Sequence, residues 1–245
     1  MSASSKIRKA VLLAAGKGTR MAELTRTVPK PLLPVAGRPI LHHVLERLSQ
    51  AGVEEVAIVI GYQGDQIRAS LAGHPLRIEF LEQHVVNGTG SAALLAREFA
   101  AQDPFLLTFG DILSTPEDYR GLAVALIPGS SAVLGVQWAE DPCRGAAVYE
   151  EDGRVLRIVE KPAPGTSSTH WNSAGLYAFT AAVFEELSRI PLSPRGEYEL
   201  TSAVELLLAH DREVRMYAVS GNWLDVGRPE DLAAAEAMVL GHGAP

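Results

Sequence analysis

A glycine-rich turn with two nearby cations is the first feature of this sequence that could do chemistry. The turn is Gly-Lys-Gly-Thr at residues 16–19, it follows a short apolar run, and Arg20 and Lys30 lie just beyond it. After the first strand of an open α/β sheet, such a turn lets backbone N–H groups approach a phosphate closely. The two cations could then hold a triphosphate and neutralise charge as it shifts during a reaction.

The glycines alone fit a simpler interpretation, a tight turn without a ligand. A dinucleotide-binding fingerprint needs a third glycine where Met21 stands, and the Walker pattern G-x-x-x-x-G-K-[ST] is absent. Arg20 and Lys30 favour a phosphate site, because two cations are hard to explain as structural parts of a loop so rich in glycine and proline.

Two aspartates, Asp111 and Asp225, each end an apolar run. Asp111 follows residues 105–109 through Gly110, and Asp225 follows Trp223 and Leu224. A carboxylate at the carboxyl end of a central strand lies where open α/β sheets bind ligands. Aspartate at a strand end is also ordinary turn chemistry, so each residue alone is weak evidence of a site.

Three further segments carry polar groups that could recognise a ligand. Gln83 precedes Gly-Thr-Gly at residues 88–90, Glu160 and Lys161 precede a proline, and Asn172 begins Asn-Ser-Ala-Gly. An amide side chain donates and accepts together, which matches the imide edge of a pyrimidine base. Each segment also has a purely structural alternative. The Gln83 segment could be a polar loop before a helix, Glu160 and Lys161 a solvated strand end, and residues 172–175 a turn.

The order and spacing of these motifs resemble one family, the sugar-1-phosphate nucleotidyltransferases. Residues 13–21, Leu-Ala-Ala-Gly-Lys-Gly-Thr-Arg-Met, are similar to its signature L-A-[GA]-G-x-G-T-R-[LM]. Residues 29–35, Pro-Lys-Pro-Leu-Leu-Pro-Val, are similar to P-K-x-L-x-P-V at the same distance. The E-K-P, N-x-[AT]-G and W-x-D-x-G motifs follow in order, and residues 195–201 resemble R-G-E-x-E-[IL]-T, although Ser202 stands where aspartate is common.

The resemblance implies a role for each of these residues. Arg20 would stabilise departing pyrophosphate, Lys30 would contact phosphates at the reaction centre, and Lys161 would hold the sugar phosphate. Asp111 and Asp225 would bind one Mg²⁺ ion together with substrate phosphates and water. The implied nucleotide-binding residues are Leu13, Ala14, Ala15, Gly16, Gly18, Thr19, Gln83, Gly88 and Thr89. The implied sugar-phosphate residues are Gly145, Glu160, Lys161 and Asn172.

The implied reaction joins a nucleoside triphosphate to a sugar 1-phosphate and releases pyrophosphate. Gln83 would read the pyrimidine edge and Gly88 would admit the base and ribose, which favours dTTP or UTP. Two alternatives stay open. One is a cytidylyl- or guanylyltransferase with another phosphorylated acceptor, such as phosphocholine, and the other is a non-catalytic module that binds nucleotide sugars.

The elements that must position these residues alternate between strands and helices, which predicts a Rossmann-like open mixed sheet with helices on both faces. A small antiparallel addition is expected over the sugar. The predicted strands are residues 9–14, 56–60, 78–81, 105–109, 132–138, 146–149, 155–159, 176–179 and 214–219. The predicted helices are residues 39–51, 91–101 with Thr89 or Ser91 as N-cap, 182–188, 200–209 and 231–240.

Composition fits a folded globular chain rather than a disordered or fibrous one. Of the 245 residues, 47% are hydrophobic and 21% charged, and the net charge of −7 argues against broad binding to nucleic acid or anionic membranes. The single cysteine, Cys143, excludes an internal disulfide. The apolar run at residues 10–15 is too short for a signal peptide, so a cytoplasmic protein is expected. One domain is expected over residues 1–245, with the family core at about residues 10–240 and flexible tails at 1–7 and 241–245; homo-oligomerisation stays open.

Overall fold

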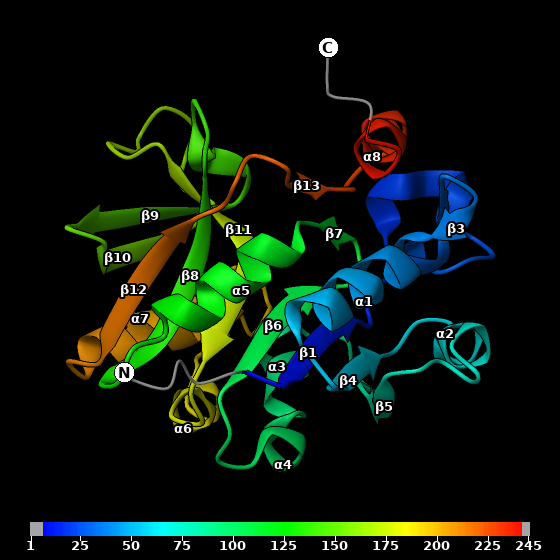
Figure 1. The fold of residues 1–245 in the computed structure, drawn as a ribbon. Coiled ribbons are helices and arrows are strands. Elements are labelled where there is room, and N and C mark those ends of the chain that lie inside the picture. The colour runs from blue at the N-terminus through cyan, green and yellow to red at the C-terminus, as the bar shows by residue number, and fades with distance from the viewer. Residues whose placement is uncertain (1–6, 242–245) are drawn as a thin grey trace.

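The computed structural model describes residues 7–241 and places nine strands in one mixed sheet with helices on both faces (Figure 1). This arrangement confirms the predicted fold class. The strands of the sheet are β1 (Lys9–Ala14), β4 (Glu55–Ile60), β5 (Arg77–Glu82), β6 (Phe105–Phe109), β8 (Ser130–Trp138), β9 (Ala146–Glu151), β10 (Arg154–Glu160), β11 (Trp171–Phe179) and β12 (Glu213–Ala218). Their order is β5-β4-β1-β6-β11-β8-β12-β10-β9.

The sheet changes character at β6. Strands β5, β4, β1 and β6 are parallel, whereas β11 runs antiparallel to both β6 and β8. The hairpin of β9 and β10 is the predicted antiparallel addition, and β9 also pairs with β11 at Asn172 and Ala147. Two short pairs lie outside the sheet, β2 (Pro34–Val35) with β3 (Arg38–Pro39) and β7 (Ile112–Leu113) with β13 (Leu224–Asp225).

Alternation of side chains along the strands produces a buried layer on each face. Leu12 of β1 packs in the cluster that includes α1 (Ile40–Ala51), whereas its neighbour Leu13 belongs to the cluster on the opposite face. The first face also carries α2 (Gly64–Ser70), α5 (Pro116–Ala125) and α8 (Asp231–Val239). The second carries α3 (Thr89–Leu94), α4 (Arg97–Ala100), α6 (Val183–Leu187) and α7 (Leu200–Ala209).

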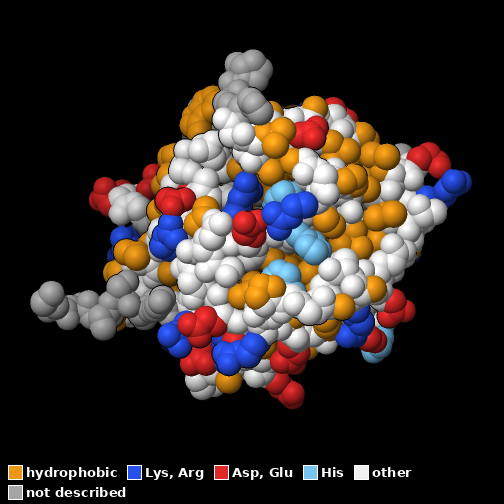
Figure 2. All heavy atoms as spheres, turned by 45° about the vertical axis from the view of Figure 1, so that its right-hand side comes forward, with side chains coloured by type: hydrophobic (Ala, Val, Ile, Leu, Met, Phe, Trp, Pro, Cys, Tyr) orange, Lys and Arg blue, Asp and Glu red, His pale blue; other side chains and the backbone are white. Residues whose placement is uncertain are grey.

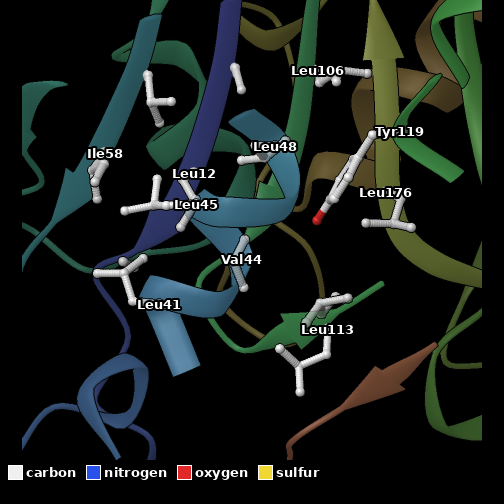
Figure 3. Packing of buried hydrophobic residues seen from close by; sticks show 14 of the residues in the cluster. Leu12, Leu41, Val44, Leu45, Leu48, Ile58, Leu106, Leu113, Tyr119 and Leu176 are labelled. Atoms are coloured by element: carbon white, nitrogen blue, oxygen red, sulfur yellow. The ribbon is translucent and has the colours of Figure 1, made fainter. Parts of the chain in front are cut away.

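Helix α1 shows how the sequence pattern becomes packing. Its apolar side chains Leu41, Leu45 and Leu48 are fully buried, and Figure 3 shows them directed toward Leu12 of β1 and Ile58 of β4. Burying each such side chain stabilises the fold by about 1.5–3 kcal/mol. Gly52 ends the helix with a φ of 102°, the left-handed conformation that favours glycine.

The predicted helix at residues 91–101 is wrong in two respects. The segment forms two short helices, α3 and α4, because the N–H groups of Leu95 and Ala96 bond to carbonyls three residues earlier and tighten the chain. Neither Thr89 nor Ser91 is the N-cap. Gly88 holds that position without a side-chain cap, and Thr89 accepts a hydrogen bond from the backbone N–H of Leu200 instead.

The turn considered for residues 172–175 is also wrong, since the segment lies inside β11. The register between β11 and β8 shifts between Ser173 and Tyr177, and Gly175 within that irregularity has a φ of 68°. A β-bulge at a glycine explains how a turn-like sequence continues as a strand.

Three further segments differ from the predicted elements and tails. Helices α2 and α5 had not been predicted. Ile7, assigned to a flexible tail, is buried in the core with 4% exposure, while the rest of that N-terminal tail and residues 242–245 lie outside the described residues. Among residues 7–241 no helix combines the length and the apolar character that crossing a bilayer requires.

Candidate active site

Two adjoining cavities open along the carboxyl edge of the parallel strands. The loop cavity, about 630 Å³, is lined by the glycine-rich loop, Gln83 and Gly88. The hairpin cavity, about 590 Å³, is lined by Gly145 and Ala146 of the β9–β10 side, by Asn172 and by Asp225. Both share Arg20, Asp111, Glu160 and Lys161 as walls. Every site residue predicted from the sequence lines one cavity or both.

The glycine-rich loop turns sharply after β1 and then forms the 3₁₀ helix η1 (Thr19–Thr25). Gly18 has a φ of 63°, and its carbonyl accepts hydrogen bonds from the backbone N–H of Met21 at 2.9 Å and from the hydroxyl of Thr25 at 3.0 Å. Met21 is fully buried and anchors the turn. A Cβ at Gly16 would have no protein atom within 4 Å, so the glycine borders open space in the loop cavity.

The two predicted metal ligands lie around one buried cation. The pairing of β7 with β13 sets Asp225 opposite Ile112, the residue after Asp111. The ammonium of Lys30 forms an ion pair with Asp111 and lies 3.8 Å from Oδ1 of Asp225. Carboxylates from positions 111 and 225 therefore meet beside the glycine-rich loop.

The electrostatics of this pair fit a divalent cation. Burial, and next the Asp111 carboxylate, raise the pKa of Asp225, while Lys30 and Arg20 oppose the rise. Among residues 7–241 no cluster of three or more His, Cys, Asp or Glu side chains could hold a metal ion. Two hard carboxylates without a third protein ligand suit Mg²⁺, which usually takes one or two carboxylates and completes its shell with phosphate and water.

The predicted base-reading segment lies on the other side of the loop cavity. Gln83 follows β5, is 7% exposed, and donates its amide N–H groups to the carbonyl of Gly88 at 3.1 Å and to the hydroxyl of Ser91 at 3.0 Å. Gly88 has a φ of 131°, and a Cβ there would collide with the backbone of Tyr198. The backbone of Tyr198 therefore requires glycine at position 88. The predicted reason for this glycine, which was to admit the base and ribose, is a different one.

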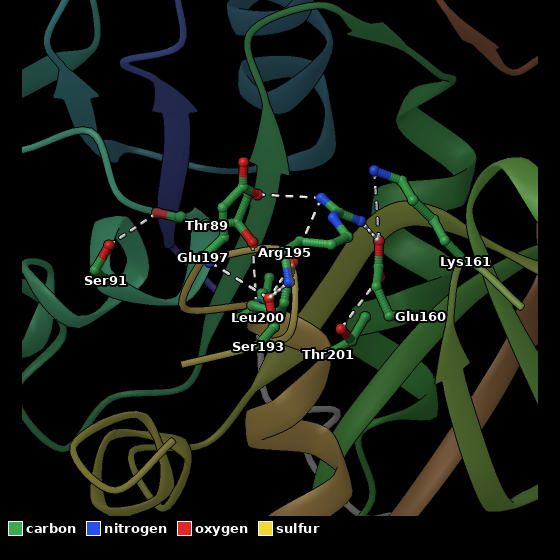
Figure 4. A network of polar contacts seen from close by, with 11 residues as sticks. Thr89, Ser91, Glu160, Lys161, Ser193, Arg195, Glu197, Leu200 and Thr201 are labelled. Carbon is green, nitrogen blue, oxygen red and sulfur yellow. Dashed lines mark hydrogen bonds and ion pairs between the residues drawn. The ribbon is translucent and has the colours of Figure 1, made fainter. Parts of the chain in front are cut away.

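Glu160 and Lys161, on the wall shared by the two cavities, belong to a network of polar contacts that extends into the loop cavity (Figure 4). Arg195 lies between carboxylates, 3.2 Å from Glu160 and 3.1 Å from Glu197. Glu160 also accepts a hydrogen bond from Thr201 at 3.2 Å and lies 4.0 Å from the ammonium of Lys161. Glu160 is therefore held from two sides, while Lys161 keeps a half-exposed ammonium at the cavity.

Asn172 and Gly145 form the far wall of the hairpin cavity. The side-chain oxygen of Asn172 is buried and has no hydrogen-bond partner within residues 7–241. A Cβ at Gly145 would collide with that same amide, which explains the glycine. An orphaned acceptor beside a cavity is a group to which a bound hydroxyl could donate.

Several cavity residues had no predicted role. Arg195, Glu199 and Thr201 line the loop cavity, and burial followed by Glu160 raises the pKa of Glu199 against the opposing effect of Arg195. Their match to R-G-E-x-E-[IL]-T was the signal that could have assigned them. Arg144 precedes Gly145 and Arg228 follows the W-x-D-x-G motif; both line the hairpin cavity, and neither was given a role from the sequence.

Comparisons with known protein sequences find relatives that match most of this chain. The family model described as nucleotidyl transferase matches residues 9–241. A glucose-1-phosphate thymidylyltransferase of Streptomyces griseus is 34% identical over 237 residues, which cover 95% of this chain and 66% of that protein. The bifunctional protein GlmU of Methanocaldococcus jannaschii is 34% identical over 233 residues, 94% of this chain and 54% of that protein. The chain thus spans about half to two thirds of the length of these relatives.

Solved structures share the fold. A UDP-glucose pyrophosphorylase complexed with UDP-glucose superposes with a TM-score of 0.83 at 22% identity, covering 97% of this chain and 100% of that one. A protein described as a putative glucose-1-phosphate thymidylyltransferase of Bacillus anthracis gives 0.84 at 24% identity, covering 97% and 96%. At these identities the likeness establishes the arrangement of elements alone.

Proposed function

This chain belongs to the nucleotidyl transferase family, and we propose that it joins a nucleoside triphosphate, dTTP or UTP, to a sugar 1-phosphate and releases pyrophosphate. The observation that carries the proposal is the meeting of Asp111, Asp225 and Lys30 beside the glycine-rich loop. The sequence identity to a thymidylyltransferase over 95% of the chain supports the same reaction class.

The two cavities suit the two substrates. The loop cavity, with glycine-rich backbone, Arg20 and Gln83 on its walls, would hold the triphosphate and its base. The hairpin cavity, with Glu160 and the orphaned oxygen of Asn172, would hold the sugar through its hydroxyl groups. Lys161 lies on the wall common to both, where a sugar phosphate and the α-phosphate would meet.

The proposed step is an in-line displacement at the α-phosphorus. An oxygen of the sugar phosphate forms the new P–O bond while the bond to the β-phosphate oxygen breaks, and pyrophosphate leaves with the electron pair. The nucleophile is already an anion, so no side chain has to remove a proton. Catalysis then depends on positioning and on neutralising charge.

The chain's own cations divide that work. Lys161 would neutralise the attacking phosphate, Arg20 would stabilise charge on the leaving pyrophosphate, and Lys30 would turn from the carboxylates to the phosphates. Asp111 and Asp225 would hold Mg²⁺, which when bound supplies further neutralisation of the triphosphate.

A substrate matrix tests the proposal. Each of dTTP, UTP, CTP, ATP and GTP would be combined with a set of sugar 1-phosphates and with phosphocholine, and pyrophosphate release measured with Mg²⁺ or with a chelator. The expected result is Mg²⁺-dependent release with dTTP or UTP and a sugar 1-phosphate. Release only with phosphocholine, only with CTP, or only with a purine nucleotide would replace the proposed substrates. Binding of nucleotide sugars without any pyrophosphate release would indicate a non-catalytic module.

A further inference from the structure

The turn between β4 and α2 lies against both ends of the glycine-rich loop. The backbone N–H of Tyr62 donates to the carbonyl of Ala15, where the loop leaves β1, at 3.2 Å. The hydroxyl of the same tyrosine donates to the carbonyls of Thr25 at 3.3 Å and Arg26 at 3.0 Å, where η1 ends. One residue thus joins the beginning and the end of the segment that carries Arg20.

Two glutamines extend these contacts along the loop. Gln63 donates its amide N–H to the carbonyl of Arg26 at 3.1 Å and to the Tyr62 hydroxyl at 2.9 Å. Gln66, on α2, donates to the carbonyl of Thr27 at 2.8 Å and to the side-chain oxygen of Gln63 at 3.2 Å. Three successive carbonyls, from Thr25 to Thr27, therefore accept hydrogen bonds from this one group of side chains, which we call the brace (Tyr62, Gln63 and Gln66).

The backbone of the turn is specialised for this contact. Gln63 has a φ of 54°, a left-handed conformation that non-glycine residues adopt rarely and that the surrounding structure must hold. At Gly61 a Cβ would lie 2.9 Å from the carbonyl oxygen of Ala15, so only glycine allows the turn to approach the loop this closely.

The brace is distinct from the substrate-binding walls. Within residues 7–241, none of its three side chains lines the loop cavity or the hairpin cavity, and none belongs to the buried core. Glu23, Leu24 and Arg26 of the braced segment are themselves exposed, and among the described side chains of η1 only Met21 and Thr25 are buried. The position of Arg20 therefore depends on how residues 25–27 are held.

We propose that Tyr62, with Gln63 and Gln66, is a positioning residue that fixes the loop of residues 15–27 and thereby aims Arg20 at the leaving pyrophosphate. This inference rests on the proposed function for the role of Arg20. It predicts a selective defect: loosening the brace weakens interaction with pyrophosphate and leaves interaction with the sugar phosphate unchanged, because Lys161 and Glu160 lie on other elements. Displacement of a catalytic group by about 1 Å can reduce a rate by about 10²-fold.

The first test measures the loop itself and is independent of activity. Amide hydrogen exchange would be compared in the wild type, Tyr62→Phe and Gln66→Ala, with Tyr149→Phe as the control, since Tyr149 lies on β9 and lines neither cavity. Loss of a hydrogen bond worth about 1.4 kcal/mol corresponds to about tenfold faster exchange. We expect that acceleration at residues 18–27 in the two brace variants alone. Unchanged exchange there would overturn the proposal.

The second test asks whether the brace acts through Arg20. Calorimetric titration with inorganic pyrophosphate and Mg²⁺ would compare the wild type, Tyr62→Phe, Arg20→Ala and the double variant. Tyr62→Phe is expected to weaken pyrophosphate binding about tenfold in the wild type and to have no further effect once Arg20 is gone, with the KM for sugar 1-phosphate unchanged. An equal effect in both backgrounds, or a raised sugar 1-phosphate KM, would overturn the proposal. If the wild type does not bind pyrophosphate, the proposed function fails. The hydrogen-exchange measurement alone then shows whether the brace holds residues 18–27.

Discussion

Lys30 shows how one buried side chain can organise a site. Its side chain is 7% exposed, and its ammonium lies against Asp111 and Asp225, which come from parts of the chain more than a hundred residues apart. A cation buried this deeply requires carboxylates near it. The same carboxylates are the proposed ligands of Mg²⁺, so the proposal requires Lys30 to exchange partners when substrate binds.

Removing either carboxylate charge should abolish turnover without unfolding the protein. Asp111→Asn and Asp225→Asn keep the size of the side chain, and burial already disfavours the charged form of Asp225. We expect kcat to fall by about 10²–10³-fold or more, while the protein keeps a cooperative thermal transition at a lowered midpoint because the second carboxylate still faces Lys30. Pyrophosphate release at saturating Mg²⁺ measures the first and thermal unfolding the second. Near-wild-type turnover in either variant would remove that residue from the metal site.

Lys161→Ala should weaken use of the sugar phosphate in particular. Its side chain is half-exposed and its ammonium comes no nearer to Glu160 than 4.0 Å, so it is available to a ligand phosphate. We expect a raised KM for sugar 1-phosphate and kcat/KM lower by about 10²-fold, with the KM for the nucleotide little changed. Arg189→Ala is the matched control, because Arg189 is an exposed cation that lines neither cavity. Unaltered sugar 1-phosphate kinetics would contradict the assigned role.

At the scale of single residues, the sequence motifs pick out residues that line the two cavities, but not the contacts that these residues make. Gly88 is glycine because a Cβ there would collide with the backbone of Tyr198. Gln83 donates its amide N–H groups to the Gly88 carbonyl and the Ser91 hydroxyl. The contact of Arg195 with Glu160 joins residues 35 positions apart. Pairings of this kind depend on how distant segments fold together, and local pattern does not report them.

Elements with a strong apolar period were predicted almost to the residue. Strands β1 and β6 and helix α7 have the predicted bounds, because a buried strand or an amphipathic helix leaves a regular pattern in the sequence. Helix α5 was missed although its start carries a capping box, in which the side chain of Thr115 accepts from the backbone of Asp118. Few of its side chains are buried, so its apolar period is weak.

Asp118 should be a main source of stability for this part of the fold. It is 0% exposed, and it accepts hydrogen bonds from Ser114 and Thr115 before α5 and from Ser220 after β12. It therefore ties α5 to the segment that leads to Asp225. Asp118→Ala leaves these donors without an acceptor and should lower the free energy of unfolding by about 3 kcal/mol.

Urea unfolding measures this loss, and Glu117→Ala is its control. Glu117 is the neighbouring acidic residue of α5, its side chain is 67% exposed, and its ion pair with Arg120 lies at the surface. Its removal should change the free energy of unfolding by less than about 0.5 kcal/mol. Equal effects of the two substitutions would show that Asp118 owes its effect to general charge rather than to its buried hydrogen bonds.

For the whole molecule, the parallel half of the sheet was the more predictable half. Parallel strands β4, β1 and β6 are buried on both faces and read as continuous apolar runs, and their carboxyl ends meet at one edge. The meeting of Asp111 and Asp225 depends instead on β7 and β13, each two residues long. No periodicity can exist in two residues, so only the family resemblance pointed to that contact.

Two partly buried histidines at the surface, His42 and His74, affect the stability of the whole molecule. Figure 2 shows histidines close to basic and acidic side chains near the centre of one face. The imidazole rings of His42 and His74 pack edge to face, with their centroids 6.3 Å apart. Burial first, and then Arg38 and His43, lower the pKa of His42, while burial and then His42 lower the pKa of His74.

These shifts predict that stability falls in mild acid. Each histidine has a lower pKa in the folded protein than the ordinary 6.5 of the unfolded chain. Between the folded and the unfolded pKa of each histidine the unfolded chain binds more protons, so the free energy of unfolding rises with pH. The contribution is complete above about pH 6.5 and is lost progressively as pH falls toward the folded pKa values. The urea midpoint of the wild type should therefore drop between pH 7.5 and pH 5.5, and the drop should shrink in the double variant His42→Gln/His74→Gln. His84→Gln, at a side chain that is 82% exposed, should leave the drop unchanged. A drop of the same size in all three proteins would assign the acid sensitivity to other groups.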